Sequence, residues 1–502
     1  MNIKQAKEEI KHTVQAYLLK DGLSRYQIDT VRQRPVLLMG PPGIGKTAVM
    51  EQIAQELSIA LVSYTMTHHT RQSAIGLPYI EECEYEKEKY SITRYTMSEI
   101  ISSVYDKMKE SGKKEGVLFL DEINCVSETL APAMLQFLQG KTFGNQKLPE
   151  GWVIVAAGNP PEYNRSVREF DVVTLDRVRE ITVEADYRVF REYAMAQGIH
   201  GAVLSYLDIK KDAFYLMETE VDGLSYVTAR GWEDLSDIMK AYETLGLPVT
   251  KEVVNGYLHH EKTAADFANY LELYRKYEQD YQIEKIWDGR FGEEHKKRLR
   301  EASFDERLSV LTMLLSAMRS GFLRAYEEDR YVTLLYEDLL TFRDRLGMEN
   351  VRGEAVLSML VNRRMEELRK KKASVRLSKI EEGICQREIE KLREYQQYAK
   401  TGEGLDAETL FDEIKHEFSK EADRRESVYD LTGQHLDAVF AFLEEVFGDG
   451  EEMVIFVTEL NVGKYSLYFL KERDCEAYFK YNRELMVHQK REQLLSEIQK
   501  EI

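Results

Sequence analysis

The sequence is poor in cysteine and has no long hydrophobic run. Its four cysteines, Cys83, Cys125, Cys385 and Cys475, lie far apart with no C-x-x-C pair, so they indicate neither a disulfide framework nor a zinc site. No run approaches the roughly 18 to 20 apolar residues that cross a bilayer. The first twenty residues are charged and helical in period, without the apolar core of a signal peptide. We therefore expect a cytoplasmic protein with reduced thiols and no membrane insertion.

Positive charge is also scarce. The chain of 502 residues has 69 Lys and Arg against 88 Asp and Glu, which gives a formal net charge of −19. Proteins that coat nucleic acid neutralise phosphates with Lys and Arg, so this balance argues against a nucleic-acid partner and leaves open only a local basic channel. The length predicts two or three domains, and 43% hydrophobic residues are enough to form their cores.

Short apolar runs alternate with helical patterns through residues 1–185. Runs rich in Val, Ile and Leu, each followed by a helix, predict an α/β fold with a mainly parallel sheet covered on both faces. The expected strands are Pro35–Met39, Ile59–Tyr64, Gly116–Leu120, Trp152–Ala157 and Arg179–Val183. The expected helices include Lys46–Leu57, Ser98–Ser111 and Ser127–Leu138.

Beyond this core the pattern becomes helical. Residues 186–247 read as helices alone, and residues 248–502 are charged, tyrosine-rich and helical in period almost to the end. The stretch Glu451–Leu470, "EEMVIFVTELNVGKYSLYFL", is β-rich by propensity but is also compatible with a buried helix. We expect three parts, with boundaries near residues 185 and 247.

The stretch "LLMGPPGIGKTAVM", Leu37–Met50, contains the G-x-x-x-x-G-K-[ST] pattern of a phosphate-binding loop. Glycines let such a loop aim successive backbone N–H groups at one point, and the following helix adds the positive end of its dipole. An apolar strand before the loop and a helix after it make an accidental glycine-rich turn improbable. The residues expected to bind a nucleotide are Gly40, Pro41, Pro42, Gly43, Ile44, Gly45, Lys46, Thr47 and Ala48.

A second strand ends in two carboxylates. In "GVLFLDEIN", Asp121 is expected to hold Mg²⁺ together with the Thr47 hydroxyl, and Glu122 to orient and polarise the attacking water. The plainer interpretation is an acidic strand end that caps a helix. The presence of the phosphate loop favours the catalytic interpretation.

A third strand, in "VIVAAGNPP", ends at Asn159, whose amide is able to hydrogen-bond both the water and the γ-phosphate. Phosphoryl transfer also gains from an arginine supplied by a neighbour. Arg177 and Arg179 in "TLDRVREI" and Arg230 in "YVTARGWEDL" are the candidates. An arginine in any of these three settings, considered alone, is more often a surface residue than a catalytic one.

In this order, the residues resemble an AAA+ ATPase, specifically the MoxR-like branch, over about Gln27–Leu247. The resemblance implies that "GPPGIGKT" is Walker A, "VLFLDE" is Walker B, Asn159 is sensor 1 and Arg230 is sensor 2. Family proteins usually have "DRF" at the arginine finger, whereas this chain has Asp176-Arg177-Val178 followed by Arg179. Arg177 is the expected finger, and Arg179 stays as the alternative.

Two inserts fit the same branch. Gly76–Thr96 reads as two alternating strands around a charged turn and looks like the hairpin inserted in helix 2. Gly140–Gly151 looks like the hairpin ahead of sensor 1. Relatives point both hairpins into a central pore, although each segment is also compatible with an ordinary surface hairpin.

The resemblance further implies ATP and Mg²⁺ as cofactors, a ring that is usually a hexamer, and a helical lid at Asp186–Leu247. It implies a protein client that the motor remodels or matures, and a partner with a von Willebrand factor A domain. Two other hypotheses stay open. One is a nucleic-acid motor or a chelatase-type subunit, and the other is a nucleotide-gated scaffold with little hydrolysis.

One basic run stands out in the acidic C-terminal half. Arg363–Lys379, "RRMEELRKKKASVRLSK", reads either as one solvated face of a long helix or as a grip for an acidic partner or nucleic acid.

Overall fold

The computed structural model describes residues 1–85, 88–143, 146–163, 167, 170–220, 223–346, 352–374, 378–401 and 406–485. The chain divides into two compact units. The first comprises Met1–Val189 with Glu366–Ser378, and the second comprises Phe190–Met365 with the residues from Lys379 onward. The parallel sheet belongs to the first unit, and the second unit is mostly helical.

The central sheet of the first unit has the strand order β2-β5-β8-β1-β9, and each described pair of neighbours is parallel. The strands are β1 (Val36–Met39), β2 (Ala60–Thr65), β5 (Gly116–Asp121), β8 (Trp152–Gly158) and β9 (Arg179–Thr182). All five expected strands are confirmed to within one residue at each end. The predicted α/β fold with a parallel sheet is therefore confirmed.

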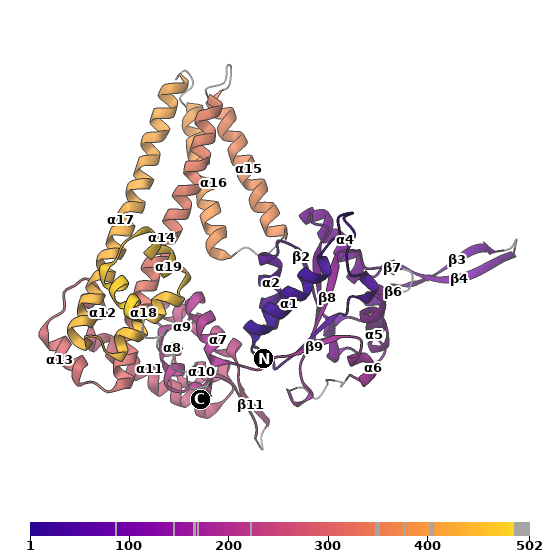
Figure 1. Ribbon diagram of the computed structural model, residues 1–502, viewed down its shortest axis with the longest axis horizontal. Helices are drawn as coiled ribbons and strands as arrows, with labels where there is room; N and C mark the ends of the chain where they lie inside the picture. Colours follow the sequence, from indigo (N-terminus) through magenta and orange to yellow (C-terminus); the bar gives the residue numbers. More distant parts are fainter. Residues whose placement is uncertain are drawn as a thin grey trace, which may run out of the picture. The chain divides into compact units, whose positions relative to one another are not determined.

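Helices cover both faces of this sheet (Figure 1). Side chains of Val36 and Leu38 point to one face, where they pack with helices α1 (Ile3–Leu18) and α2 (Lys46–Glu56). Leu37, between them, points to the other face and packs with α4 (Glu99–Ser111) and α5 (Ala131–Gly140). Burial of both faces explains why the strands read as continuous apolar runs.

Helix α5 begins later than the sequence pattern indicated. The predicted helix Ser127–Leu138 starts with a turn in which the N–H groups of Leu130 and Ala131 donate to the Ser127 carbonyl. Pro132 lies in the first turn of α5, where its missing N–H costs nothing. The prediction was wrong by four residues at this end, because a turn precedes the proline-started helix.

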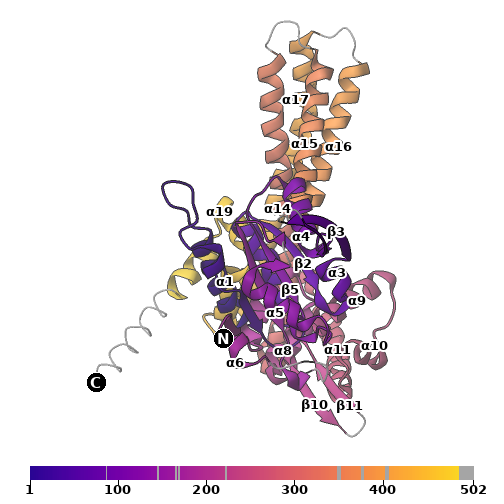
Figure 2. The same cartoon turned by 90° about the vertical axis from the view of Figure 1, so that its right-hand side faces the viewer.

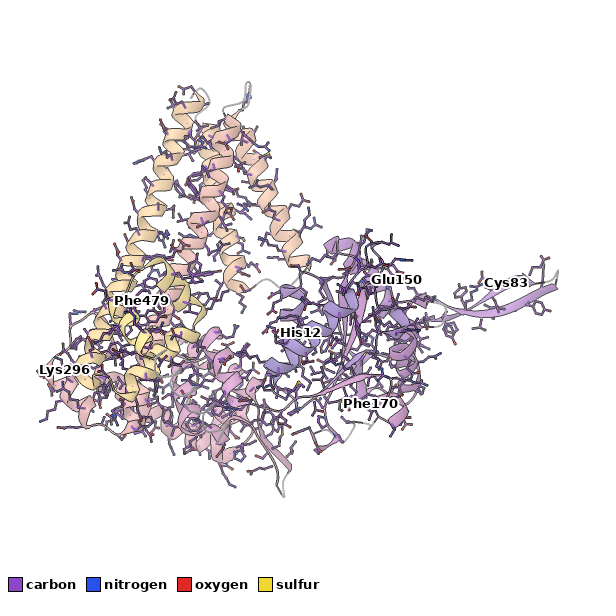
Figure 3. The ribbon with its side chains drawn as sticks, in the orientation of Figure 1. His12, Cys83, Glu150, Phe170, Lys296 and Phe479 are labelled. Carbon is purple, nitrogen blue, oxygen red and sulfur yellow. The ribbon has the colours of Figure 1, made fainter. Side chains whose placement is uncertain are left out.

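Both predicted insert hairpins are present. Strands β3 (Pro78–Tyr85) and β4 (Glu88–Tyr95) are antiparallel, as are β6 (Thr142–Phe143) and β7 (Gln146–Lys147). The β3–β4 hairpin projects from the first unit in Figure 1, and Figure 3 shows Cys83 along it. The short elements that complete this unit are η1 (Thr30–Arg32), η2 (Met66–His68), α3 (Arg71–Ile75), η3 (Ile123–Cys125), η4 (Pro161–Tyr163) and α6 (Val172–Leu175).

The described part of the second unit is helical except for one hairpin. Its helices are α8 (Gly201–Ile209), η5 (Lys211–Phe214), α9 (Ala229–Leu245), α10 (Lys251–Leu258), α11 (Glu261–Tyr281), α12 (Ile283–Trp287), α13 (Glu293–Glu301), α14 (Phe304–Leu346), α16 (Lys379–Thr401), α17 (Ala407–Phe447), α18 (Glu451–Val462) and α19 (Lys464–Glu472). Helices α7 (Tyr187–Gln197) and α15 (Gly353–Ser374) contain residues of both units. None of the described helices combines the length and the apolar character that a membrane span requires.

The expectation of helices alone after residue 186 was wrong at one place. Strands β10 (Leu216–Glu220) and β11 (Gly223–Val227) form an antiparallel hairpin. The indole of Trp232 donates to the carbonyls of Ala213 and Phe214, and these bonds fix the segment that precedes β10. The β-branched and aromatic residues of "SYVT" also favour a strand over a helix.

The segment Glu451–Leu470 forms helices α18 and α19 rather than strands. Met453, Phe456, Val457 and Leu460 are all buried, and their spacing places them on one helix face. This face packs on α14 and α17. The spacing of three to four residues between buried positions is that of a helix, and it outweighed the β propensity of the individual residues.

Helices α14, α16 and α17 run side by side in both views (Figures 1 and 2). The interior of this bundle contains charge. Asp338 of α14 is 0% exposed and accepts hydrogen bonds from Arg363 at 2.6 Å and Arg364 at 2.9 Å. Arg364 also pairs with buried Glu388 of α16 at 2.8 Å.

These contacts correct one interpretation of the basic run Arg363–Lys379. Its first two arginines are internal ion-pair partners of α14 and α16, so the run does not form a solvated face along its whole length. Residues 375–377 of the run lie outside the described residues.

Candidate nucleotide-binding site

The phosphate loop lies between the end of β1 and the start of α2. Gly43 and Gly45 have φ angles of 73° and 94°, in the left-handed region that favours glycine. The N–H groups of Gly43, Ile44 and Gly45 take part in none of the hydrogen bonds that the structure describes. The loop therefore presents free backbone donors next to a helix N-terminus, which suits an anionic ligand.

The predicted binding residues form one continuous segment here. Gly40 follows β1 and donates to the Gly158 carbonyl of β8 at 3.3 Å. A side chain at Gly40 would meet the carbonyl of Val183, the residue after β9, at 3.0 Å, so this glycine allows close packing there. Pro41, Pro42, Gly43, Ile44 and Gly45 make the loop, and Lys46, Thr47 and Ala48 open α2.

Lys46 connects the loop to the end of β8. Its ammonium is buried, and it donates to the carbonyls of Gly40 at 2.7 Å and Pro41 at 2.9 Å. It also donates to the side-chain oxygen of Asn159 at 2.8 Å. These contacts hold the ammonium at the phosphate loop, where a phosphate group is a favourable hydrogen-bond partner for a cation.

Thr47 connects the start of α2 to the end of β5. Its hydroxyl donates to one carboxylate oxygen of Asp121 at 2.8 Å. The other oxygen of Asp121 accepts from the backbone N–H of Glu122 at 2.9 Å. A hydroxyl and a carboxylate held together in this way are the oxygen ligands that Mg²⁺ prefers.

Glu122 has an unusual backbone conformation. Its φ of 56° lies in the left-handed region, which is uncommon outside glycine, and such strain is often found at functional sites. The hydroxyl of Thr67 donates to its carboxylate at 3.0 Å. Burial and the neighbouring carboxylates of Glu122 and Asp121 raise the pKa of the Cys125 thiol, which keeps this cysteine protonated beside the site.

Asn124 fixes the position of Asn159. It is 2% exposed, its amide donates to the Asn159 carbonyl at 2.7 Å, and its oxygen accepts from the Asn159 N–H at 3.3 Å. Gly158 leaves the room for this pair, because a side chain there would lie 2.7 Å from the Asn124 oxygen.

The sequence did not single out Asn124 or Thr67 as site residues. Asn124 lies two residues after Glu122, and this position close to the β5 carboxylates is the sequence feature that could have indicated it. Thr67 follows β2, which is the neighbour of β5 in the sheet. Its contact with Glu122 depends on that strand order, which residue spacing does not reveal.

The three candidate arginines have different surroundings. Arg177 is exposed and its guanidinium contacts the Gln139 side chain of α5. Arg179 is held by its own chain, where it pairs with Glu9 and also contacts Thr13, both on α1. Arg230 belongs to the second unit, where it is exposed in the first turn of α9. The first unit thus brings together Lys46, Thr47, Asp121, Glu122 and Asn159.

The donor set fits a magnesium-bound triphosphate. Free N–H groups and the Lys46 ammonium suit phosphate oxygens, while Thr47 and Asp121 supply hard oxygen ligands for the cation. A family model described as "ATPase family associated with various cellular activities (AAA)" matches residues 36–176. Residues 36–176 form an AAA ATPase domain. The match contains the whole phosphate loop, Asp121, Glu122 and Asn159, and it ends one residue before Arg177.

Two known proteins resemble parts of the chain. Lon protease 2 of Borreliella burgdorferi is 34% identical over 108 residues, which are 21% of this chain and 12% of that protein. The chain thus spans about an eighth of this relative's length. A solved structure of a proline-to-glycine mutant of Thermotoga maritima RuvB is 13% identical, with a TM-score of 0.27, and covers 50% of this chain and 69% of that one. That score is too low to add to the assignment of the AAA domain.

Proposed function

We propose that this protein is a Mg²⁺-dependent ATPase of the MoxR-like type that works as a ring and remodels or matures protein clients. The observation that carries the catalytic part is a pair of hydrogen bonds from the start of α2 to two strand ends. Thr47 to Asp121 joins α2 to β5, and Lys46 to Asn159 joins α2 to the residue that follows β8. One site thus holds residues suited to bind phosphate, to hold the metal ion and to position water.

The residues have separate roles in this proposal. The backbone N–H groups of the loop and the Lys46 ammonium bind and orient the triphosphate. Thr47 and Asp121 would hold Mg²⁺, which would supply positive charge to the phosphate groups. Glu122 takes a proton from the attacking water, and Asn159 orients that water. Asn124 is a positioning residue, because it acts through Asn159.

The ring proposal assigns Arg177 as the finger that reaches the ATP of the neighbouring subunit. Its exposure supports this role, whereas Arg179 already pairs with Glu9 of its own subunit. In the same proposal, residues 1–185 are the core, residues 186–247 the lid and residues 248–502 an extension. Arg230 then contacts the γ-phosphate from the lid. Hydrolysis removes that contact and releases the lid.

The client part of the proposal draws on the β3–β4 hairpin. Leu77, Tyr79, Ile80 and Tyr90 are between 46% and 75% exposed along it. In MoxR-like relatives this insert points into the ring pore, and an apolar surface there suits an unfolded protein segment. The resemblance also supplies the proposed von Willebrand factor A domain partner.

Mixing two inactive variants tests the ring. Arg177→Ala keeps an intact phosphate loop, and Lys46→Ala keeps an intact finger. Each alone is expected to lose at least about a hundredfold in ATP turnover. A mixture is expected to recover part of the activity, at interfaces where an intact phosphate loop of one subunit meets an intact Arg177 of its neighbour. Absence of any recovery, in mixtures shown to co-assemble, would contradict the assignment of Arg177.

A capture experiment tests the client. Glu122→Gln is expected to bind ATP without hydrolysing it and so to retain a bound client, which mass spectrometry identifies after affinity purification. Recovery of DNA or RNA in place of protein would favour the nucleic-acid motor.

A further inference from the structure

A groove on the helical bundle of the second unit has a strongly one-sided charge. It lies between one face of α16 and the first half of α17, and its cavity volume is about 650 Å³. The residues from α16 recur at helical spacing, as do those from α17, so each set shares a face. The lining residues are Lys391, Glu394, Tyr395, Tyr398, Thr409, Asp412, Glu413, Ile414, His416 and Glu417.

Carboxylates outnumber the basic groups of this groove. Four carboxylates line it, from Glu394, Asp412, Glu413 and Glu417, against one lysine, Lys391, and one histidine, His416. Glu417 pairs with Lys420, which does not line the groove, at 2.6 Å. Lys391 is already paired with Glu394 at 2.9 Å and with Glu421 behind it at 3.2 Å. Among the interactions of the described residues none involves the exposed Asp412 side chain. The groove therefore has an excess of negative charge that its own residues do not balance.

A second observation comes from Tyr395, which lines the groove but is only 3% exposed. Its hydroxyl is buried and has no hydrogen-bond partner within the described part of the chain. Burial raises the pKa of this phenol, and the nearby carboxylates of Glu421, Glu417 and Glu394 raise it further. A buried hydroxyl without a partner is costly, and a cationic N–H donor would satisfy it in this negative field.

The remaining groove residues suit the same kind of ligand. Tyr398 is 42% exposed, and its hydroxyl donates to Glu413, so its ring is fixed at the edge of the groove. Such a ring offers a face to a cation or to the methylene stem of a lysine. Buried Ile414 forms an apolar floor for that stem.

We propose that this groove binds the lysine or arginine side chains of a basic segment of a protein partner. Charge complementarity selects this occupant, because the negative excess repels nucleic acid and acidic peptides alike. The described residues contain no group of three metal-ligating side chains, which argues against a divalent cation. The binding concerns the bundle alone and holds whether or not the ATPase proposal is correct.

A peptide titration on the full-length protein tests the groove. The probe is a fluorescein-labelled peptide of alternating lysine and glycine, and the matched negative probe replaces lysine with glutamate. Fluorescence anisotropy is expected to show salt-sensitive binding of the lysine peptide and none of the glutamate peptide. The double variant Asp412→Asn, Glu413→Gln is expected to weaken binding about tenfold.

Two further variants separate the groove from general acidity. Glu390→Gln removes an exposed carboxylate of α16 that does not line the groove, and it is expected to bind like the wild type. Tyr395→Phe removes only the hydroxyl, and it is expected to weaken binding about threefold to tenfold with an unchanged salt dependence. Equal weakening by Glu390→Gln and by the double variant would overturn the proposal.

The same titrations distinguish other occupants. If MgCl₂ or CaCl₂ alone raised the melting temperature of the wild type but not of the double variant, the ligand of the groove would be a metal ion. If the wild type formed a concentration-dependent dimer and the double variant did not, the ligand would be a second copy of the chain. Either result would contradict a basic partner segment. ATP turnover measured on the same samples is expected to be unchanged.

Discussion

Lys141 is a buried cation that has no carboxylate partner in the part of the chain that the structure describes. It is 4% exposed, and its ammonium donates to the Gln33 side chain at 2.9 Å. Burial lowers its pKa from 10.5 to about 8. Below pH 8 both the folded and unfolded states carry this proton, so the folded state bears the full cost of the buried charge. Between about pH 8 and 10.5 the unfolded state binds more protons, and stability rises with pH.

Replacing this cation tests the sign of that effect. Lys141→Met is expected to raise the free energy of unfolding by roughly 1–3 kcal/mol at pH 7. The gain is expected to shrink as pH rises from 8 toward 10.5, because folded wild-type Lys141 gives up its proton in this range and no longer bears a buried charge. Urea unfolding of both proteins across this range measures the difference. A gain that grows with pH would contradict the account.

Asn124 determines where Asn159 lies, because both hydrogen bonds of its side-chain amide are made to the Asn159 backbone. Asn124→Ala is expected to reduce the free energy of unfolding by about 1–3 kcal/mol, since it leaves buried backbone groups unpaired. It is also expected to lower kcat more than nucleotide affinity. Asn124→Asp keeps the size but not the donor, so a matching loss of kcat there would tie the effect to the hydrogen bond.

Arg177 and Arg179 are expected to behave in opposite ways. Arg179→Met breaks the pair with Glu9 and is expected to cost about 0.5–2 kcal/mol of stability while retaining most ATP turnover. Arg177→Ala is expected to leave the melting temperature unchanged and to abolish turnover. Calorimetry and phosphate release on both variants provide the comparison. If Arg179→Met lost turnover at full stability, the two assignments would have to be exchanged.

At the scale of elements, the bundle of α14 to α17 depends on buried ion pairs. Asp338→Asn leaves Arg363 and Arg364 without their shared carboxylate and is expected to cost about 3–5 kcal/mol. Asp344→Asn is the matched control, because Asp344 lies on the same helix with its side chain 66% exposed. It is expected to cost less than about 0.5 kcal/mol. Chemical unfolding measures both variants, and equal costs would show that the pairs contribute nothing.

The sequence was sufficient to predict the central sheet, because strands buried on both faces must be apolar throughout. It was insufficient for the β10–β11 hairpin, whose position depends on a tryptophan hydrogen bond made from α9. It also left the Glu451–Leu470 segment open between strand and helix. Packing of one face on α14 and α17 decided the outcome there.

The candidate site was predictable to a similar degree. Lys46, Thr47, Asp121, Glu122 and Asn159 follow from motifs at strand ends, since parallel strands bring those ends to one edge. Spacing gave no sign of the Thr67 contact or of the left-handed backbone at Glu122, because both depend on how loops meet in space. The partners of Arg363 and Arg364 were hidden for the same reason.

At the scale of the whole molecule, the helices that follow the core share their interior with the last helices of the chain. Arg191 of α7 pairs with Asp208 of α8 at 2.5 Å and also with Glu459 of α18. Tyr270 of α11 donates to Ser205 of α8 at 2.6 Å. Because these residues belong to one compact unit, any movement that nucleotide imposes on α8 is expected to carry α18 with it.

In the proposed mechanism, three strand ends and the start of α2 form one nucleotide-hydrolysing site. The most direct test measures ATP binding and steady-state phosphate release for the wild type and Glu122→Gln in the same preparations. The variant is expected to bind ATP with wild-type affinity and to release phosphate at least about a hundredfold more slowly, since the carboxylate that takes the proton is gone. Phosphate release at the wild-type rate would contradict the catalytic role of Glu122.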